Sequence, residues 1–388
     1  MDSITLRANE SCTEGGMIYE LASLYAYFEK VIDPRKRKGI RYQLATLLIL
    51  ILLAKLGGQD HPTGIAEWSK HREAGLVELL KLPRKRVPHH CTFRRVLREL
   101  EPEWFEQAMG EYQRSRQPGD QEIVISIDGK TLRGTIVKKQ GRGVHLLAAY
   151  LPGSGLVLMQ VAVECKENEI VAAPQLLQSI DLNGAIVIGD AMHTQRKISM
   201  QIVAAGGDYL WTVKGNQART EWAIEKLFVQ EAANRKKGAP LSKDFQLASQ
   251  ITKGHGRIEK RTIIVSQALN EYLDWPYVAQ VFRLEREVWH EDGKRKTREV
   301  VYGLTSLSRQ KASPKRLLTL TRGYWGIENG LHYRRDVTLH EDATRATAGH
   351  TGHNLAIFNN LVISLTLSNG HRNLPRARRL FDAHPEKA

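Results

Sequence analysis

The sequence feature that most constrains the fold is an alternation of short apolar segments with segments of helical periodicity between residues 121 and 240. Segments such as 123–127 (IVISI) are almost entirely apolar, as strands buried on both faces of a sheet tend to be. The sequence Pro-Gly-Ser-Gly at 152–155 indicates a hairpin turn, so the first three strands should form a meander. The strands that the pattern predicts are 123–127, 144–150, 156–163, 185–188 and 209–213, and the predicted helices are 169–180 and 194–205.

A meander followed by strand–helix units predicts a mixed α/β sheet with helices on its faces. This is the element order of the ribonuclease-H-like fold, and we expect its first part at 121–240. Residues 241–308 are rich in Val, Ile and Thr, which predicts an inserted antiparallel β-subdomain. The core is expected to resume with helices in 309–370.

The flanks of this core are expected to differ from it. Residues 19–116 show helical patterns interrupted by Gly and Pro, which predicts an N-terminal helical domain and a candidate DNA-binding domain. Residues 115–121 (SRQPGDQ) indicate a linker. Residues 1–18 are expected to be a loose tail, and residues 371–388 a basic tail that frays.

Composition and charge exclude several classes of protein. The three cysteines lie far apart with no Cys-x-x-Cys, which argues against a disulfide scaffold or a zinc ribbon and fits a reducing compartment. The apolar run 44–54 is shorter than the roughly 20 residues of a membrane-spanning helix, so we expect a buried core helix. Without a signal-peptide pattern, a cytoplasmic protein is expected. The formal charge of +15 favours a phosphate-rich partner, although simple solubility is the alternative.

Two aspartates stand where an apolar strand gives way to a loop. Asp128 follows the segment 123–127, and Asp190 follows the segment 185–188 by one glycine. Ligands bind at this edge of open α/β sheets, so neighbouring strands would bring both carboxylates into one crevice. Converging carboxylates suit Mg²⁺ or Mn²⁺, and two such ions about 3.5–4 Å apart can support phosphodiester chemistry. Each aspartate alone is more simply a turn or capping residue, but the pair in so basic a chain favours a metal site.

A third carboxylate is expected in the segment 320–345. If residues 321–334 form one helix, Tyr324, Glu328 and His332 share one face at i, i+4 and i+8, and Arg335 lies near that face. An acid beside an aromatic ring, a His and an Arg suits a site that holds metal and phosphate. A solvated amphipathic helix is the alternative. The competing acids of the segment are Asp336, Glu341 and Asp342.

These segments carry a resemblance to a known family. The chain resembles the DDE transposases of bacterial insertion sequences, in the branch of the H-repeat-associated proteins. The resemblance extends over about 33–367, and seven segments in the same order are far more specific than any single motif. The segments are DPRKRKGIRYQLATLLILILLAKLGG, IAEW, ISIDGKTLRG, KENEIVAAPQLL, GAIVIGDAMHTQ, GGDYLWTVKGNQ and WGIENGLHYRRDVTLHEDATR.

The resemblance implies a ribonuclease-H-like catalytic core with a β-rich insertion before the glutamate. By position, the catalytic and metal-binding triad of the family falls on Asp128, Asp190 and Glu328, which selects Glu328 over its competitors. The two aspartates would bridge two Mg²⁺ or Mn²⁺ ions, and the glutamate would hold one of them. In the related larger group, the glutamate helix carries a Tyr, an Arg and a Lys at set spacing. The corresponding positions here hold Thr321, Tyr324 and Arg335, and only Arg335 keeps the chemistry of the family residue.

The implied function is transposition of DNA. The protein would bind double-stranded DNA at the ends of its insertion sequence, hydrolyse a phosphodiester to free a 3′-hydroxyl, and join that hydroxyl to target DNA. A homodimer on DNA is expected because two ends are processed together, with no small-molecule cofactor and no membrane. The alternatives are a catalytically silent DNA-binding relic or repressor with the same fold, and a nuclease without strand transfer. The intact acidic triad favours catalysis.

DNA contact is expected to be mainly electrostatic, since phosphate contacts supply most non-specific affinity. The side chains expected to contact DNA near the triad are Lys130, Arg133, Lys214, Asn216, His332 and Arg335. Further basic clusters lie at 35–41, 81–86, 94–98, 311–316 and 372–379.

Overall fold

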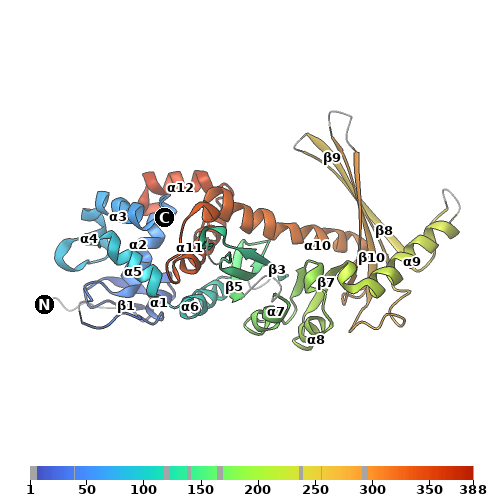
Figure 1. Cartoon of the computed structure of the whole chain (residues 1–388), viewed down its shortest axis with the longest axis horizontal. Coiled ribbons are helices and arrows are strands. Elements are labelled where there is room, and N and C mark those ends of the chain that lie inside the picture. The colour runs from blue at the N-terminus through green and yellow to red at the C-terminus, as the bar shows by residue number, and fades with distance from the viewer. Residues whose placement is uncertain are drawn as a thin grey trace.

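The computed structural model describes residues 7–38, 40–117, 122–137, 141–163, 169–235, 239–254, 256–290 and 296–387. The expected linker at 115–121 lies largely outside these residues. The centre of the molecule is a large mixed sheet with helices on its faces (Figure 1). Its strand order is β5-β4-β3-β6-β7-β11-β10-β9-β8. A separate small sheet pairs β1 (Glu10–Cys12), which lies in the segment expected to be loose, with β2 (Ile18–Glu20), which begins at the last residue of that segment.

The core of the large sheet confirms the predicted mixed α/β architecture. A meander of antiparallel strands is followed by two strands that run parallel to its first member. This is the strand order expected of a ribonuclease-H-like sheet. The meander consists of β3 (Val124–Thr131), β4 (His145–Leu151) and β5 (Leu156–Val163), and the parallel strands are β6 (Ile186–Gly189) and β7 (Asp208–Val213). The connecting helices are α7 (Glu169–Gln178) and α8 (Arg196–Ala204).

The end of β3 differs from the expectation in a way that matters for the site. The strand does not end at Asp128, because β4 continues to pair with it for three more residues. On the opposite edge of β3, the pairing with β6 stops at Ile127 and Gly189. Asp128 and Asp190 are therefore each the first residue beyond the last pair of the two parallel strands.

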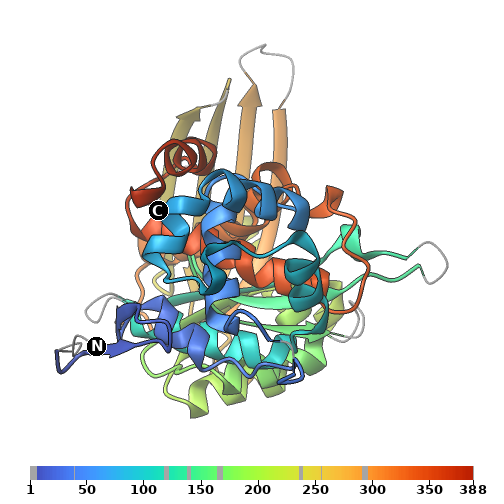
Figure 2. The ribbon, with the colours of Figure 1, turned by 90° about the vertical axis from the view of Figure 1, so that its left-hand side faces the viewer.

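The strands expected in the inserted β-subdomain are antiparallel to one another and extend the core sheet beyond β7. From the core outward they are β11 (Lys296–Thr305), β10 (Gln280–His290), β9 (Arg257–Ser266) and β8 (Phe245–Gly254). Helix α9 (Ala218–Asn234) leads into them and packs against β10 and β11. These four strands project beyond the body of the molecule (Figures 1 and 2), and we call them the β-arm.

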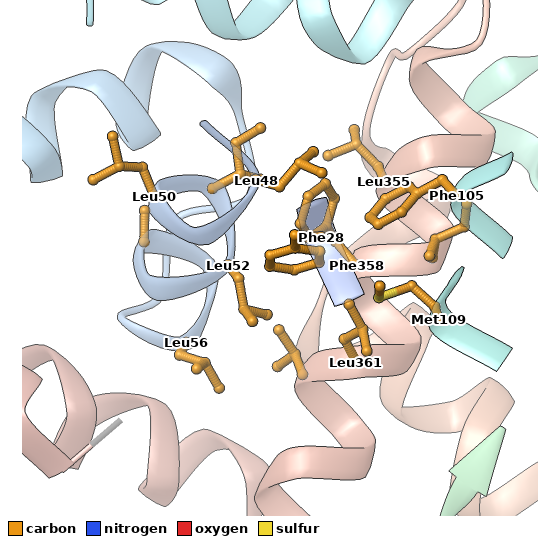
Figure 3. Packing of buried hydrophobic residues seen from close by; sticks show 14 of the residues in the cluster. Phe28, Leu48, Leu50, Leu52, Leu56, Phe105, Met109, Leu355, Phe358 and Leu361 are labelled. Atoms are coloured by element: carbon orange, nitrogen blue, oxygen red, sulfur yellow. The ribbon is translucent and has the colours of Figure 1, made fainter. Parts of the chain in front are cut away.

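The helices at the two ends of the chain share one hydrophobic core. Helix α11 (Thr351–Ser368) contacts β5 as well as the N-terminal helices, and its Phe358 ring lies 6.5 Å from Phe28 and 5.0 Å from Phe105 (Figure 3). Helix α2 (Leu44–Leu56) is buried along most of its length, as its apolar sequence predicts. No helix in the described part of the chain is both long and apolar enough to span a bilayer. The remaining N-terminal helices are α1 (Leu24–Glu29), α3 (Pro62–His71), α4 (Glu73–Leu79), α5 (His90–Glu99) and α6 (Pro102–Ser115).

The C-terminal segment differs from the expected frayed basic tail. It contains α12 (Leu374–Ala383), whose Phe381 joins the same hydrophobic core. Arg378 is buried, and its guanidinium donates to both carboxylate oxygens of Asp60 at 2.9 Å. An arginine is rarely buried without such a partner. The helix therefore packs because one of its basic residues is neutralised by an acid that lies far away in the sequence.

The shared core predicts that one substitution weakens both ends of the chain together. Phe358→Ala should lower the free energy of unfolding by about 3–5 kcal/mol, because a fully buried ring is removed. The loss should appear in a single transition when urea unfolding is followed by circular dichroism and by tryptophan fluorescence. Val171→Ala, at a side chain that is 75% exposed on α7, is the control and should change little. Two separate transitions, of which one shifts, would contradict the shared core.

Candidate active site

The two-residue period of the strands turns both aspartates toward the same helix. Ile127 and Gly189 face the core layer that contains Trp211, on the side of α7 and α8. The next residue of each strand points to the opposite face. On that face, Ile188 packs with leucines of α10 (Pro314–Ile327). Asp128 and Asp190 are therefore presented to the side of the sheet that α10 covers.

Glu328 and His332 belong to the helical segment that continues α10. The helix widens here into π-helical turns, Glu328–His332 and Arg334–Thr338, a distortion that is frequent at functional sites. One oxygen each of Asp128 and Glu328 and one ring nitrogen of His332 lie within 4.8 Å of one another. The His332 Nδ1 atom is 3.5 Å from Asp128 Oδ2 and 3.9 Å from Glu328 Oε2.

Asp190 lies beside this group. It stands outside the 4.8 Å group but lines a cavity of about 280 Å³ together with Glu328 and Tyr324. Its Oδ1 accepts hydrogen bonds from the backbone N–H groups of Met192 at 2.9 Å and His193 at 3.4 Å. The capping role that a lone aspartate would suggest is thus present, and it fixes the carboxylate at the sheet edge. We call Asp128, Asp190, Glu328 and His332 the acid cluster.

The carboxylates of the acid cluster repel one another. Burial, reinforced by the charges of Glu328 and Asp190, raises the pKa of Asp128 to about 7. Burial, helped by the charges of Arg335 and Lys130, lowers the pKa of His332 to about 3, so its ring is neutral. Among the described residues, the buried Nε2 atom of His332 has no hydrogen-bond partner. Oxygen ligands in such a repulsive arrangement fit a hard divalent cation.

A buried carboxylate supports both aspartates from the other side of the sheet. The Glu169 Oε1 atom is 2.8 Å from Nε2 of His145, and its Oε2 atom is 3.4 Å from Nε2 of His193. Burial alone would raise the pKa of Glu169, but the two histidine contacts outweigh it and lower the pKa to about 2. A Cβ atom at Gly129 would lie 2.4 Å from the Glu169 carboxylate, so the residue after Asp128 must be a glycine for this approach.

Glu169 and His145 were missed by the sequence analysis. Both lie on the α7 side of the sheet, away from the strand-end acids. The only signal was that Glu169 falls in KENEIVAAPQLL, a segment that carries the family resemblance without an assigned role.

The acids that compete with Glu328 are occupied by basic partners. Lys130 Nζ lies 2.6 Å from Asp336 and 3.5 Å from Asp342. Arg335 is fully buried, and its Nε donates to the Glu341 carboxylate at 2.9–3.0 Å. None of the three acids belongs to the metal-compatible groups found among the described residues. Lys130 and Arg335, which the sequence suggested as DNA contacts, are paired with these acids, and their contact with DNA stays a prediction.

The other residues expected to contact DNA differ in their surroundings. Lys214 lines the same cavity as Asp190 and Glu328. Arg133 is 78% exposed and lies 3.7 Å from Asp342. Asn216 donates to the carbonyl of Ala191 at 2.5 Å, so it holds the turn that follows Asp190. Contact with DNA remains a prediction for Lys214 and Arg133, and Asn216 has a structural partner.

Comparison with known proteins identifies the family. Residues 119–365 match the model described as "Transposase DDE domain", and residues 25–113 match "DDE_Tnp_1-associated". The chain is 30% identical over 346 residues to "H repeat-associated putative transposase YhhI" of Escherichia coli (strain K12), which covers 85% of this chain and 86% of the relative. It is 30% identical over 361 residues to "Putative transposase YncI" of Escherichia coli O157:H7, and this alignment covers 89% of this chain and 87% of the relative. The chain belongs to the transposase DDE domain family, which confirms the resemblance.

A solved structure shows a weaker likeness. The "Cryo-EM structure of piggyBac transposase synaptic complex with hairpin DNA (SNHP)" aligns with 92% of this chain and 78% of that chain, at 10% identity and a TM-score of 0.43. A score this low carries no inference about this chain.

The buried Glu169 predicts a stability contribution with a defined pH dependence. Its folded-state pKa, about 2, lies below the ordinary 4.5, so it stabilises the fold above pH 4.5 and loses this effect as the pH falls toward 2. Glu169→Gln should cost about 2–3 kcal/mol at pH 7, and the difference from wild type should shrink between pH 5 and pH 3. Urea unfolding at each pH measures this. The exposed Glu78→Gln is the control, and equal stability of all three proteins at pH 7 would refute the role.

The raised pKa of Asp128 predicts a pH dependence of stability opposite in sign to that of Glu169. The folded protein holds this proton up to about pH 7, whereas the unfolded chain releases it near 3.8, so the group destabilises the metal-free fold increasingly as the pH rises. Asp128→Asn removes this destabilisation, which amounts to up to about 4 kcal/mol at pH 8, so it should raise the melting temperature in EDTA at that pH. At pH 4 the melting temperature should change little. Mg²⁺ or Mn²⁺ should stabilise the wild type but not the variant.

The exposed Asp244→Asn provides the comparison for this experiment. It should behave as wild type in EDTA and with either metal. An Asp128→Asn protein that is less stable than wild type at pH 8 would contradict the repulsive cluster.

Proposed function

We propose that this protein cuts and joins DNA at the ends of its own insertion sequence, with the acid cluster as its divalent-metal site. The observation that carries the proposal is the convergence of Asp128, Glu328 and His332 within 4.8 Å, beside a cavity that Asp190 also lines. The membership of the transposase family supports the same chemistry.

The residues of the acid cluster fit the metal. Asp128 and Asp190 would be shared between two Mg²⁺ or Mn²⁺ ions, and Glu328 would hold one of them. When bound, such ions polarise the phosphodiester and lower the pKa of the attacking hydroxyl group. The neutral His332 ring faces the carboxylates of Asp128 and Glu328 and keeps them oriented.

The residues around the acid cluster would position the substrate. Lys214 lies on the same cavity and would contact a phosphate of the bound strand. Tyr324 lines the cavity next to Glu328, and burial together with the nearby carboxylates raises its pKa, so its hydroxyl stays protonated. The substrate is double-stranded DNA, and a homodimer would bring two element ends together.

The acid cluster lowers the stability of the metal-free fold, and this favours a catalytic protein over a silent DNA-binding relic. A group of repelling, partly buried carboxylates destabilises the metal-free fold. Mutations that remove such a cost are easily acquired when function does not require it. Ionisable groups with strongly shifted pKa values at a cleft are typical of active sites.

Cleavage and joining of DNA provide the test. Wild type with Mg²⁺ or Mn²⁺ and DNA that carries the terminal sequences of the element should release 3′ ends and join them to a second DNA. Asp190→Asn and Glu328→Gln should lower the cleavage rate on the order of 10³-fold, because each removes a metal ligand. Glu299→Gln, which lines the same cavity outside the acid cluster, should stay within a few-fold of wild type.

The products separate the alternatives. Variants as active as wild type would sink the assignment of the acid cluster. Cleavage without joining would indicate a nuclease, and specific binding without either reaction would indicate a DNA-binding relic.

A further inference from the structure

A second cavity adjoins that of the acid cluster and extends along the β-arm. It has a volume of about 740 Å³ and lies between the β-arm and the end of α10, and Arg257 is one of its lining residues. Arg261, Arg286 and Arg322 line both this cavity and the one that contains Asp190. The two cavities therefore meet at three arginines. We call the surface formed by Arg257, Arg261, Arg286 and Arg322 the arginine groove.

The two-residue period of the β-arm creates the arginine groove. On β9, Ile263 and Val265 are buried in a core cluster that includes leucines of α10. Arg261 and Arg257 continue the same face of the strand further from the core. On β10, Arg286 lies directly opposite Arg261 and so points to the same side. One face of the β-arm thus changes from apolar to basic along its length.

Within the described part of the chain, the acids found in ion pairs with the groove are fewer than its arginines. Arg261 pairs with the buried Glu259 at 2.6 Å, and Arg286 pairs with the same carboxylate. Arg286 also lies 3.7 Å from Glu299. Burial lowers the pKa of Arg261, and the charges of the other three arginines lower it further although Glu259 opposes them. The four guanidinium groups are therefore close enough to repel one another.

A bound anion would relieve the repulsion among the four guanidinium groups, just as a bound cation would relieve the repulsion among the carboxylates of the acid cluster. Guanidinium groups bind phosphate oxygens through paired hydrogen bonds, which is why Arg dominates phosphate recognition. The volume is typical of a pocket that encloses a small molecule, so it has room for a short stretch of one nucleic-acid strand. A positively charged groove that follows the backbone is the usual way to hold a single strand.

We propose that the arginine groove binds the phosphate backbone of the DNA strand whose phosphodiester enters the acid cluster. The inference rests on the proposed function, because this strand is the substrate. It also assigns a role to one face of the β-arm. Together with Lys214, the basic residues that hold the reacting strand would then come from the β-arm and α10, whereas Lys130 and Arg335 contact acids of the protein itself.

Charge reversal in the groove tests this proposal. Arg257→Glu and Arg322→Glu leave both ion pairs of Glu259 in place, because neither variant removes Arg261 or Arg286. Binding is measured in EDTA by fluorescence anisotropy with three labelled DNAs of the element end: a duplex, a single strand, and a duplex with a single-stranded 3′ extension. Each variant should bind the single strand and the extended duplex at least about tenfold more weakly than wild type does. The slope of log K against log salt should fall by about one for each phosphate that the variant no longer neutralises.

The matched control is Lys260→Glu. Lys260 lies on the same strand as Arg257 and Arg261, and the two-residue period places it on the opposite face. This variant should bind all three DNAs nearly as wild type does. Thermal unfolding checks that each variant is folded, and Arg257→Lys and Arg322→Lys, which keep the charge, should recover most of the affinity.

The outcomes are distinguishable from failure of the proposed function. Unchanged affinity in the folded groove variants, or an equal loss in Lys260→Glu, would overturn the arginine groove. A loss confined to the plain duplex would overturn its assignment to one strand. A wild type that binds through the arginines but neither cleaves nor joins DNA would reject catalysis and leave the groove standing. Cleavage that survives both reversals unchanged would reject the groove and leave catalysis standing.

Discussion

The repulsion among Asp128, Asp190 and Glu328 is the constraint on which the rest of the structure depends. Like charges stay close only if the backbone that carries them cannot relax. The parallel pairing of β3 and β6 fixes the two aspartates, and the packing of α10 on the sheet fixes the glutamate. Glu169 braces the strand ends from the far side through two histidines. The sheet, the helix and the buried glutamate thus hold together an arrangement that, under the proposed function, a divalent cation would complete.

The sequence predicted the core strands and the position of both aspartates at the sheet edge, because these depend on local properties. A buried strand is apolar over consecutive residues, and a polar residue just beyond it marks the sheet edge. Glu328 was harder, since its segment contains several acids and periodicity could not choose among them. The choice depends on tertiary partners: Lys130 and Arg335 neutralise Asp336, Glu341 and Asp342, and leave Glu328 to face Asp128.

The basic residues were the least predictable part of the chain, because a charge does not reveal its partner. Arg378 belongs to an apparent basic tail, yet its partner Asp60 lies 318 positions earlier. The arginine groove shows the reverse case. Its members come from two strands and a helix that lie apart in the sequence, so no short window of sequence shows all four as a cluster. The wrong prediction of a frayed basic tail and the failure to predict the arginine groove have one cause. Long-range contacts decide whether an arginine binds an acid or faces solvent.

The β-arm also limits how such a chain can change in length during evolution. Loss or gain of one residue within β9 would exchange the faces of every residue beyond it. Arg261 would move to the face of Lys260, or Ile263 would leave the core cluster it shares with α10. Length changes inside the strand are therefore tolerated only in pairs of residues. Single insertions and deletions among relatives should accumulate between the strands and be purged within them.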